Sequence, residues 1–233
     1  MNNKAYPLYY LILSFLAGII LTILIFIGSS QVYSVKPFEE KQILAVGFLI
    51  ACVFGLSCSW FPGWYRTTKT KKRNLISNST KIQRKRIGHH PDCHQFKNHI
   101  LKINKNIYCA GCFGISCGLL CAIILMIMYL INPLKFSLFV LKIMFIIAIS
   151  VIPFVFIEIL YTKKNLILHI ILNILFIISF FLLIVSTYEL TSDIRFGFIA
   201  MIFSFLFLRT RIECSQINHA SICNSCNESC KMY

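Results

Sequence analysis

Seven of the eleven cysteines in this chain of 233 residues lie in two clusters that also contain histidine. In the first cluster, Cys109 and Cys112 form a Cys-x2-Cys pair. Such a pair places two thiolates on one tight turn, where both can bind the same tetrahedral ion. We therefore predict a structural zinc site in this segment. Its predicted ligands are Cys93, His99, Cys109 and Cys112, and the alternatives to His99 are His89, His90 and His94.

The second cluster lies near the C-terminal end of the sequence. Cys223 and Cys226 have the same spacing, and Cys230 with His219 completes a set of four, with Cys214 as the alternative to His219. Part of a bacterial ferredoxin run has a similar order of cysteines, but the full run needs a further Cys-x2 step that is absent here. Zinc is therefore preferred to an iron–sulfur cluster.

Metal is favoured because the segment around the first cluster is too short and too polar to bury a core of its own. Zinc contributes folding free energy directly in such segments. A second hypothesis remains open, in which the protein is a membrane oxidoreductase or a metal-handling transporter. The same cysteines would then be redox groups or transient metal ligands.

The segment from Cys93 to Gly118 has the order Cys-His-Gln, followed by Cys-x2-Cys-x-Gly ahead of an apolar run. In this order it resembles an uncharacterised family of small prokaryotic integral membrane proteins that carry a "CHQ … CxRCxGxYxG" pattern. Gly111 and His99 stand where members of that family tend to have arginine. The resemblance implies a membrane protein with a Cys/His site, and it implies no particular reaction.

The composition indicates the class of protein that carries this site. Hydrophobic residues make up 58% of the chain and charged residues 13%, and the mean hydropathy is +0.75. Soluble domains carry roughly 25% charged residues. These values exclude a soluble globular protein, a disordered chain and a small secreted disulfide scaffold. We predict an all-α integral membrane protein.

Six apolar runs account for the predicted bundle of about six transmembrane helices, since a span needs roughly 20 apolar residues. The last run is short and spans only if the residues before it extend it. The predicted organisation is two helices in residues 1–61, a cytoplasmic Cys/His-rich insert in 62–112, further helices in 113–208 and a cytoplasmic Cys-rich tail in 209–233. The runs are Tyr9–Gly28, Ile43–Phe61, Phe113–Ile131, Phe136–Tyr161, Leu166–Thr187 and Phe196–Leu208.

The distribution of basic residues predicts the orientation. With six spans, 18 Lys and Arg residues fall on one side and 4 on the other, and the basic side is retained in the cytoplasm. We therefore predict a multi-pass protein of the cell membrane with both termini in the cytoplasm. The net charge of +15 is then explained by contact with the lipid bilayer and its anionic headgroups, without a nucleic-acid partner.

Polar residues inside the predicted spans are candidates for function, because burying them in a bilayer is costly. Glu158 and His169 lie at similar depth on either side of a short loop, and Asn173 shares a helix face with His169. They form either a proton or cation relay or a structural group near the membrane surface, and the structural interpretation is preferred. The Gly114-x3-Gly118 spacing predicts a close contact between helices.

The predicted orientation can be tested by thiol labelling. A membrane-impermeant thiol reagent added outside intact cells should leave Cys93, Cys109, Cys223 and Cys226 unlabelled, because both clusters are predicted to face the cytoplasm. Permeabilised cells provide the positive control. Labelling of either cluster from outside would overturn the orientation and would reopen the possibility of disulfides.

Overall fold

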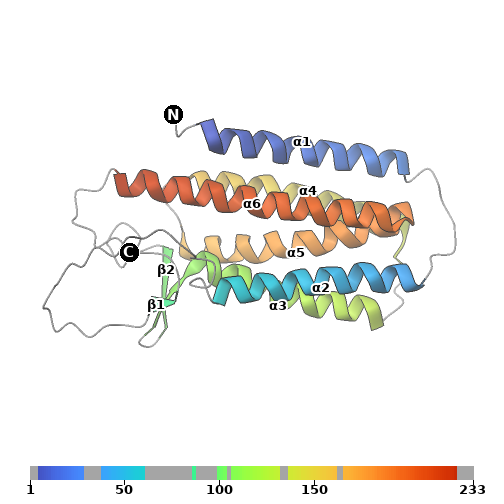
Figure 1. Ribbon diagram of the computed structural model, residues 1–233, viewed down its shortest axis with the longest axis horizontal. Coiled ribbons are helices and arrows are strands. Elements are labelled where there is room, and N and C mark those ends of the chain that lie inside the picture. The colour runs from blue at the N-terminus through green and yellow to red at the C-terminus, as the bar shows by residue number, and fades with distance from the viewer. Residues whose placement is uncertain are drawn as a thin grey trace, which may run out of the picture.

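A computed structural model of the chain describes residues 5–28, 38–60, 86–87, 99–103, 106–131, 136–161 and 165–224. These residues form six α-helices and three short β-strands (Figure 1). The helices are α1 Ala5–Gly28, α2 Phe38–Trp60, α3 Ala110–Ile131, α4 Leu138–Leu160, α5 Leu166–Thr191 and α6 Ile194–Asn224, and the strands are β1 Arg86–Ile87, β2 Ile100–Ile103 and β3 Asn106–Cys109.

The helices α1 to α5 are each long and apolar enough to cross a membrane. This confirms the prediction of a helical, membrane-like protein. The helices lie side by side along the bundle, and α1 begins and α6 ends at the end that carries the β-sheet, here called the sheet end (Figure 1). In α5, half of the most apolar stretch is buried, against 22% in α1 and α2. The helix α5 is therefore the central element, and the peripheral helices expose apolar side chains as a lipid-facing surface requires.

The helix α6 differs from the sequence prediction. It begins at Ile194 and continues without a break to Asn224, past the predicted boundary at residue 208. Asp193 marks its start, because its carboxylate accepts a hydrogen bond of 2.8 Å from the Arg195 backbone amide. The Arg195 guanidinium also bonds this carboxylate and holds the pKa of Asp193 below its usual range. The first part of the predicted cytoplasmic tail is thus helical and packed against the bundle.

A small three-stranded sheet precedes α3, and the sequence analysis did not predict it. Its strand order is β1-β3-β2, with β1 parallel and β2 antiparallel to β3. Cys109 is the last residue of β3 and pairs with Ile100 of β2, and α3 begins at the next residue. The sheet therefore sets the position from which α3 enters the bundle.

Two glycines allow α3 to approach α5 closely, as the Gly-x3-Gly spacing predicted. A Cβ atom on Gly114 would lie 2.8 Å from the carbonyl oxygen of Ile170. A Cβ atom on Gly118 would lie 2.9 Å from the Cβ atom of Ile177. Only hydrogen fits between these backbones, so the contact between the two helices depends on both glycines.

Gly118→Ala should therefore destabilise the protein, because the added methyl group overpacks this contact. We expect a loss of about 1–3 kcal/mol, measured as a lower midpoint of thermal unfolding in detergent. Gly18→Ala is the matched control, since no atom lies within 4 Å of a Cβ at Gly18 and alanine favours helix over glycine. Equal effects of the two substitutions would contradict the close contact.

Candidate functional site

The Cys109–Cys112 pair lies where the sheet joins the bundle. Cys109 ends β3, and Cys112 lies in the first turn of α3. Cys109 is buried, Cys112 is partly buried, and neither forms a disulfide. The two thiols are in hydrogen-bonding contact with each other. The positive end of the α3 dipole lies at this point and favours negative charge on a thiol.

Two side chains from other helices reach the turn between the cysteines. A Cβ atom on Gly111 would lie 2.8 Å from Nη2 of Arg211 and 3.2 Å from Nε2 of His169. These groups come from α6 and α5, respectively. The absence of a side chain at Gly111 therefore gives a guanidinium and an imidazole access to the backbone that joins the two thiols.

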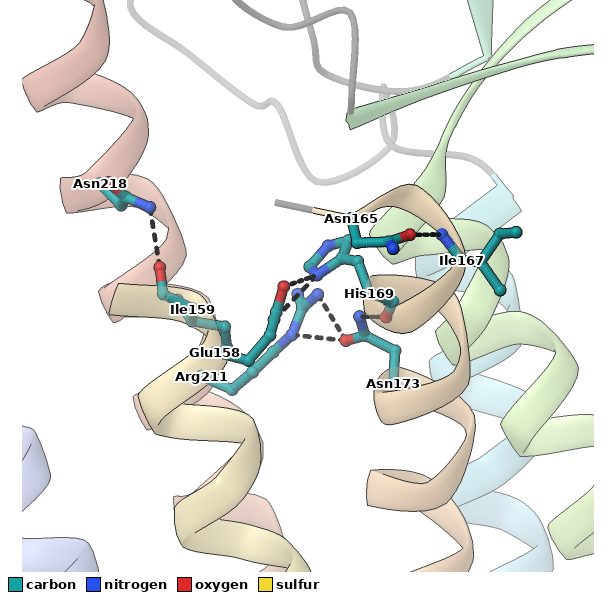
Figure 2. Close-up of polar contacts among 8 residues, drawn as sticks. All are labelled: Glu158, Ile159, Asn165, Ile167, His169, Asn173, Arg211 and Asn218. Carbon is teal, nitrogen blue, oxygen red and sulfur yellow. Dashed lines mark hydrogen bonds and ion pairs between the residues drawn. The ribbon is translucent and has the colours of Figure 1, made fainter. Parts of the chain in front are cut away.

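Arg211 is held in place by Asn173 (Figure 2). Its Nε and Nη2 atoms donate hydrogen bonds of 3.0 and 2.7 Å to Oδ1 of Asn173. The amide nitrogen of Asn173 donates to the backbone carbonyl of His169, four residues earlier on α5. Only 6% of Arg211 is exposed, so its charge depends on groups inside the protein, and it interacts electrostatically with Glu158, Cys109 and Cys112.

Glu158 and His169 form the pair that the sequence analysis considered. Nδ1 of His169 lies 3.0 Å from each carboxylate oxygen of Glu158, and both side chains are at most 10% exposed. The carboxylate accepts a hydrogen bond from Nδ1 and so places the proton of a neutral imidazole there. Nε2 then faces Gly111. The pair links α4 to α5, while Arg211 links α5 to α6.

The two histidines nearest these groups come from the two predicted clusters. His99, just before β2, is buried, and its ring centroid lies 6.0 Å from that of His169 and 5.6 Å from that of His219. The rings meet edge to face in both contacts. The structure thus brings one histidine of the first cluster beside one histidine of the tail cluster at the sheet end.

The predicted zinc ligands are only partly covered by the structure. Among the residues that the structure describes, no group of three or more His, Cys, Asp or Glu side chains could hold a metal ion. His99, Cys109, Cys112 and His219 belong to this part of the chain, and they do not form such a group. Zinc binding therefore stays a prediction. The remaining predicted positions lie outside the described residues or have no described side chain: Cys93, Cys223, Cys226 and Cys230, with the alternatives His89, His90 and His94.

Arg211 is the residue of this site that sequence analysis missed. It was counted among the basic residues of a cytoplasmic segment, because the apolar run ends at Leu208. The structure shows buried residues along α6 at helical intervals through Phe207, Arg211 and Cys214, so a packed helix face continues beyond the apolar run. The local sequence alone does not separate this arginine from one at a membrane surface.

No protein-family model, curated protein or solved structure matches this chain. The description of the site therefore depends on its own geometry.

The buried position of Arg211 can be tested by comparison with Arg209, two residues earlier on α6. Arg211→Met should destabilise the protein by about 3–5 kcal/mol, because it leaves the buried Glu158 carboxylate without its neighbouring positive charge. Arg209 is 57% exposed and pairs with Glu213, so Arg209→Met should cost at most about 1 kcal/mol. Denaturant unfolding in detergent measures both. Similar losses would show that Arg211 lies at the surface.

Proposed function

We propose that this protein is an integral membrane thiol–disulfide oxidoreductase whose redox pair is Cys109 and Cys112. The observation that carries the proposal is the contact between two thiols that form no disulfide at the start of α3, beside the buried guanidinium of Arg211, whose Nη2 lies 2.8 Å from the point that a Cβ on Gly111 would occupy. Thiolates are the reactive form of cysteine. The helix N-terminus and the neighbouring arginine favour a thiolate here, whereas burial and the adjacent thiol oppose it. The basic-residue count predicts that the pair works at the cytoplasmic face of the membrane.

The proposed reaction is exchange with a substrate that contains a disulfide. The thiolate of one cysteine attacks one sulfur of the substrate disulfide, whose S–S bond breaks as a mixed disulfide forms. The departing substrate sulfur takes a proton. The second cysteine then loses its proton and attacks the mixed disulfide, which releases the other substrate thiol and leaves a Cys109–Cys112 disulfide. Two electrons pass from the protein to the substrate.

The same geometry gives less support to a zinc site at this pair. Zinc needs about four ligands, and the described residues form no such group. A buried guanidinium next to the thiols also repels a divalent cation while it attracts a thiolate.

Transport through the bundle is also less supported. The buried polar side chains Asn173 and His169 lie near one end of α5, and Thr187 and Thr191 lie near the other. Between them α5 buries apolar side chains that include Phe176, whose ring packs against that of Phe180 at a centroid distance of 4.6 Å and against that of Phe156 at 6.2 Å. This aromatic group separates Asn173 and His169 from the hydroxyl groups farther along α5, which also include those of the buried Ser179 and Ser186.

The proposal is tested by redox equilibration of the purified protein in detergent. In buffers of increasing glutathione disulfide, a Cys109–Cys112 disulfide should form reversibly, as measured by mass spectrometry after the free thiols are alkylated. Cys109→Ser and Cys112→Ser should each abolish it. Cys117→Ser, which removes another thiol of α3, is the matched control and should leave it unchanged.

Two results would overturn the proposal. One is a pair that stays reduced at every glutathione ratio. The other is stoichiometric zinc in the purified protein that is lost on Cys109→Ser, which would support the structural zinc site instead.

A further inference from the structure

The positive charge of the protein is concentrated at the end of the bundle that carries Cys109 and Cys112. The parts of the chain that belong to this sheet end carry 18 Lys and Arg residues against 4 Asp and Glu residues, whereas the rest of the chain carries 5 against 4. Almost all of the net charge of +15 therefore belongs to the sheet end. These parts are residues 1–4, 61–109, 158–165 and 209–233.

The acidic side chains that the structure describes at the sheet end have positively charged or hydrogen-bonding partners of their own. Glu158 contacts His169 at 3.0 Å and interacts electrostatically with Arg211, and Glu213 pairs with Arg209. These two carboxylates are thus compensated locally, and they do little to reduce the positive potential around the cysteine pair.

An exposed lysine lies on the same small sheet as Cys109. Lys102 is an exposed residue of β2, two residues after Ile100, which is the register partner of Cys109. Alternate residues of a strand share one face of the sheet and lie about 7 Å apart. A solvent-accessible positive charge is therefore close to the site in the folded protein, and its position follows from the strand register.

A second positive charge lies deeper, beside the thiols themselves. Nη2 of Arg211 is 2.8 Å from the point that a Cβ on Gly111 would occupy, and the guanidinium interacts electrostatically with both cysteines. Only 6% of this arginine is exposed, so water screens its charge less than that of a surface residue. Positive charge thus extends from the surface of the sheet end to the reacting sulfur atoms.

The burial of the two cysteines limits the size of a substrate. Cys109 is 3% exposed and Cys112 is partly buried. The sulfur atom of a substrate must therefore come close to the junction of β3 and α3, where Arg211 from α6 also lies. A small disulfide can make this approach more easily than a disulfide that is held inside a folded protein.

We propose that the substrates of the Cys109–Cys112 pair are small disulfides that carry negative charge, such as disulfides of thiols with carboxylate groups. The positive potential of the sheet end attracts these molecules and raises their concentration at the thiols. In the exchange, the pair becomes a Cys109–Cys112 disulfide and the substrate becomes two thiols that keep their carboxylates. This assignment rests on the proposed function, because it names the substrate class of the same reaction.

The experiment compares three small disulfides that differ in charge as oxidants of the reduced protein, in an uncharged detergent at pH 7. They are 3,3′-dithiodipropionate with two carboxylates, bis(2-hydroxyethyl) disulfide with no charge, and cystamine with two ammonium groups. Each rate is divided by the rate at which 2-mercaptoethanol, an uncharged thiol, reduces the same disulfide, so that differences in intrinsic reactivity cancel. Formation of the Cys109–Cys112 disulfide is followed by mass spectrometry after alkylation.

The relative rate should be highest for dithiodipropionate and lowest for cystamine, with a difference of about 10-fold or more at an ionic strength of 0.01 M. At 1 M the three relative rates should converge, because the screening length falls from about 30 Å to about 3 Å. Dependence on salt separates attraction by charge from a difference in shape among the three probes.

Lys102→Gln tests the contribution of the sheet. It should lower the relative rate for dithiodipropionate by about 2-fold at low salt, raise that for cystamine by a similar factor, and leave that for the uncharged probe unchanged. Lys142→Gln is the matched control, because it removes the same charge from an exposed position of α4 in the other half of the bundle. It should react like the wild type.

The two proposals fail in different ways. A reduced pair that none of the three probes can oxidise would overturn the thiol–disulfide function. A pair that all three oxidise at equal relative rates, with no effect of salt, would overturn the selection of anionic substrates and leave the function in place. Faster oxidation by insulin, a folded acidic protein with disulfides, than by dithiodipropionate would overturn the assignment of a small substrate.

Discussion

The buried positive charge of Arg211 is the feature on which the structure of the sheet end depends, because it requires partners from several helices. Arg211 is almost fully buried, and a buried guanidinium is costly without compensating groups. Asn173 supplies the acceptor, Glu158 supplies the opposite charge, and the two thiols lie beside it. Since these partners come from three other helices, satisfying the one charge fixes the relative positions of α3, α4, α5 and α6.

The close contact between α3 and α5 makes this arrangement possible. The glycines of α3 bring its backbone against α5, and Gly111 at the start of the same helix leaves room for Arg211 and His169. Further polar contacts tie the outer helices to the bundle. Ser14 of α1 and Thr210 of α6 are hydrogen-bonded at 2.6 Å, and Asn218 of α6 donates to the carbonyl of Ile159 in α4 at 2.7 Å (Figure 2). Such bonds between helices retain value in lipid, where no water competes for the polar groups.

The chemical character of the cysteines follows from this setting. A Cys-x2-Cys pair by itself serves zinc and redox chemistry equally well, because both need two thiolates on one turn. The buried positive charge of Arg211 beside the pair is the feature that favours the proposed redox use, because it opposes a divalent cation and attracts a thiolate. The contact of His99 with both His169 and His219 also means that the segment before α3 and the end of α6 are coupled to the same site.

The sequence by itself determined the class of the protein, because composition and the length of apolar runs are local properties that a bilayer selects directly. It also predicted the Gly114–Gly118 contact and placed Glu158 and His169 at similar depth, which depend on helical spacing and on one short loop. The sheet before α3 escaped prediction, because strands of two to four residues are specified by their partners and not by their own pattern. The place of Arg211 was decided only by tertiary structure. A single arginine beyond an apolar run has the same local sequence signal at a membrane surface as inside a bundle, and the difference lies in Asn173, Glu158 and Gly111, which are distant in the sequence and adjacent only after folding.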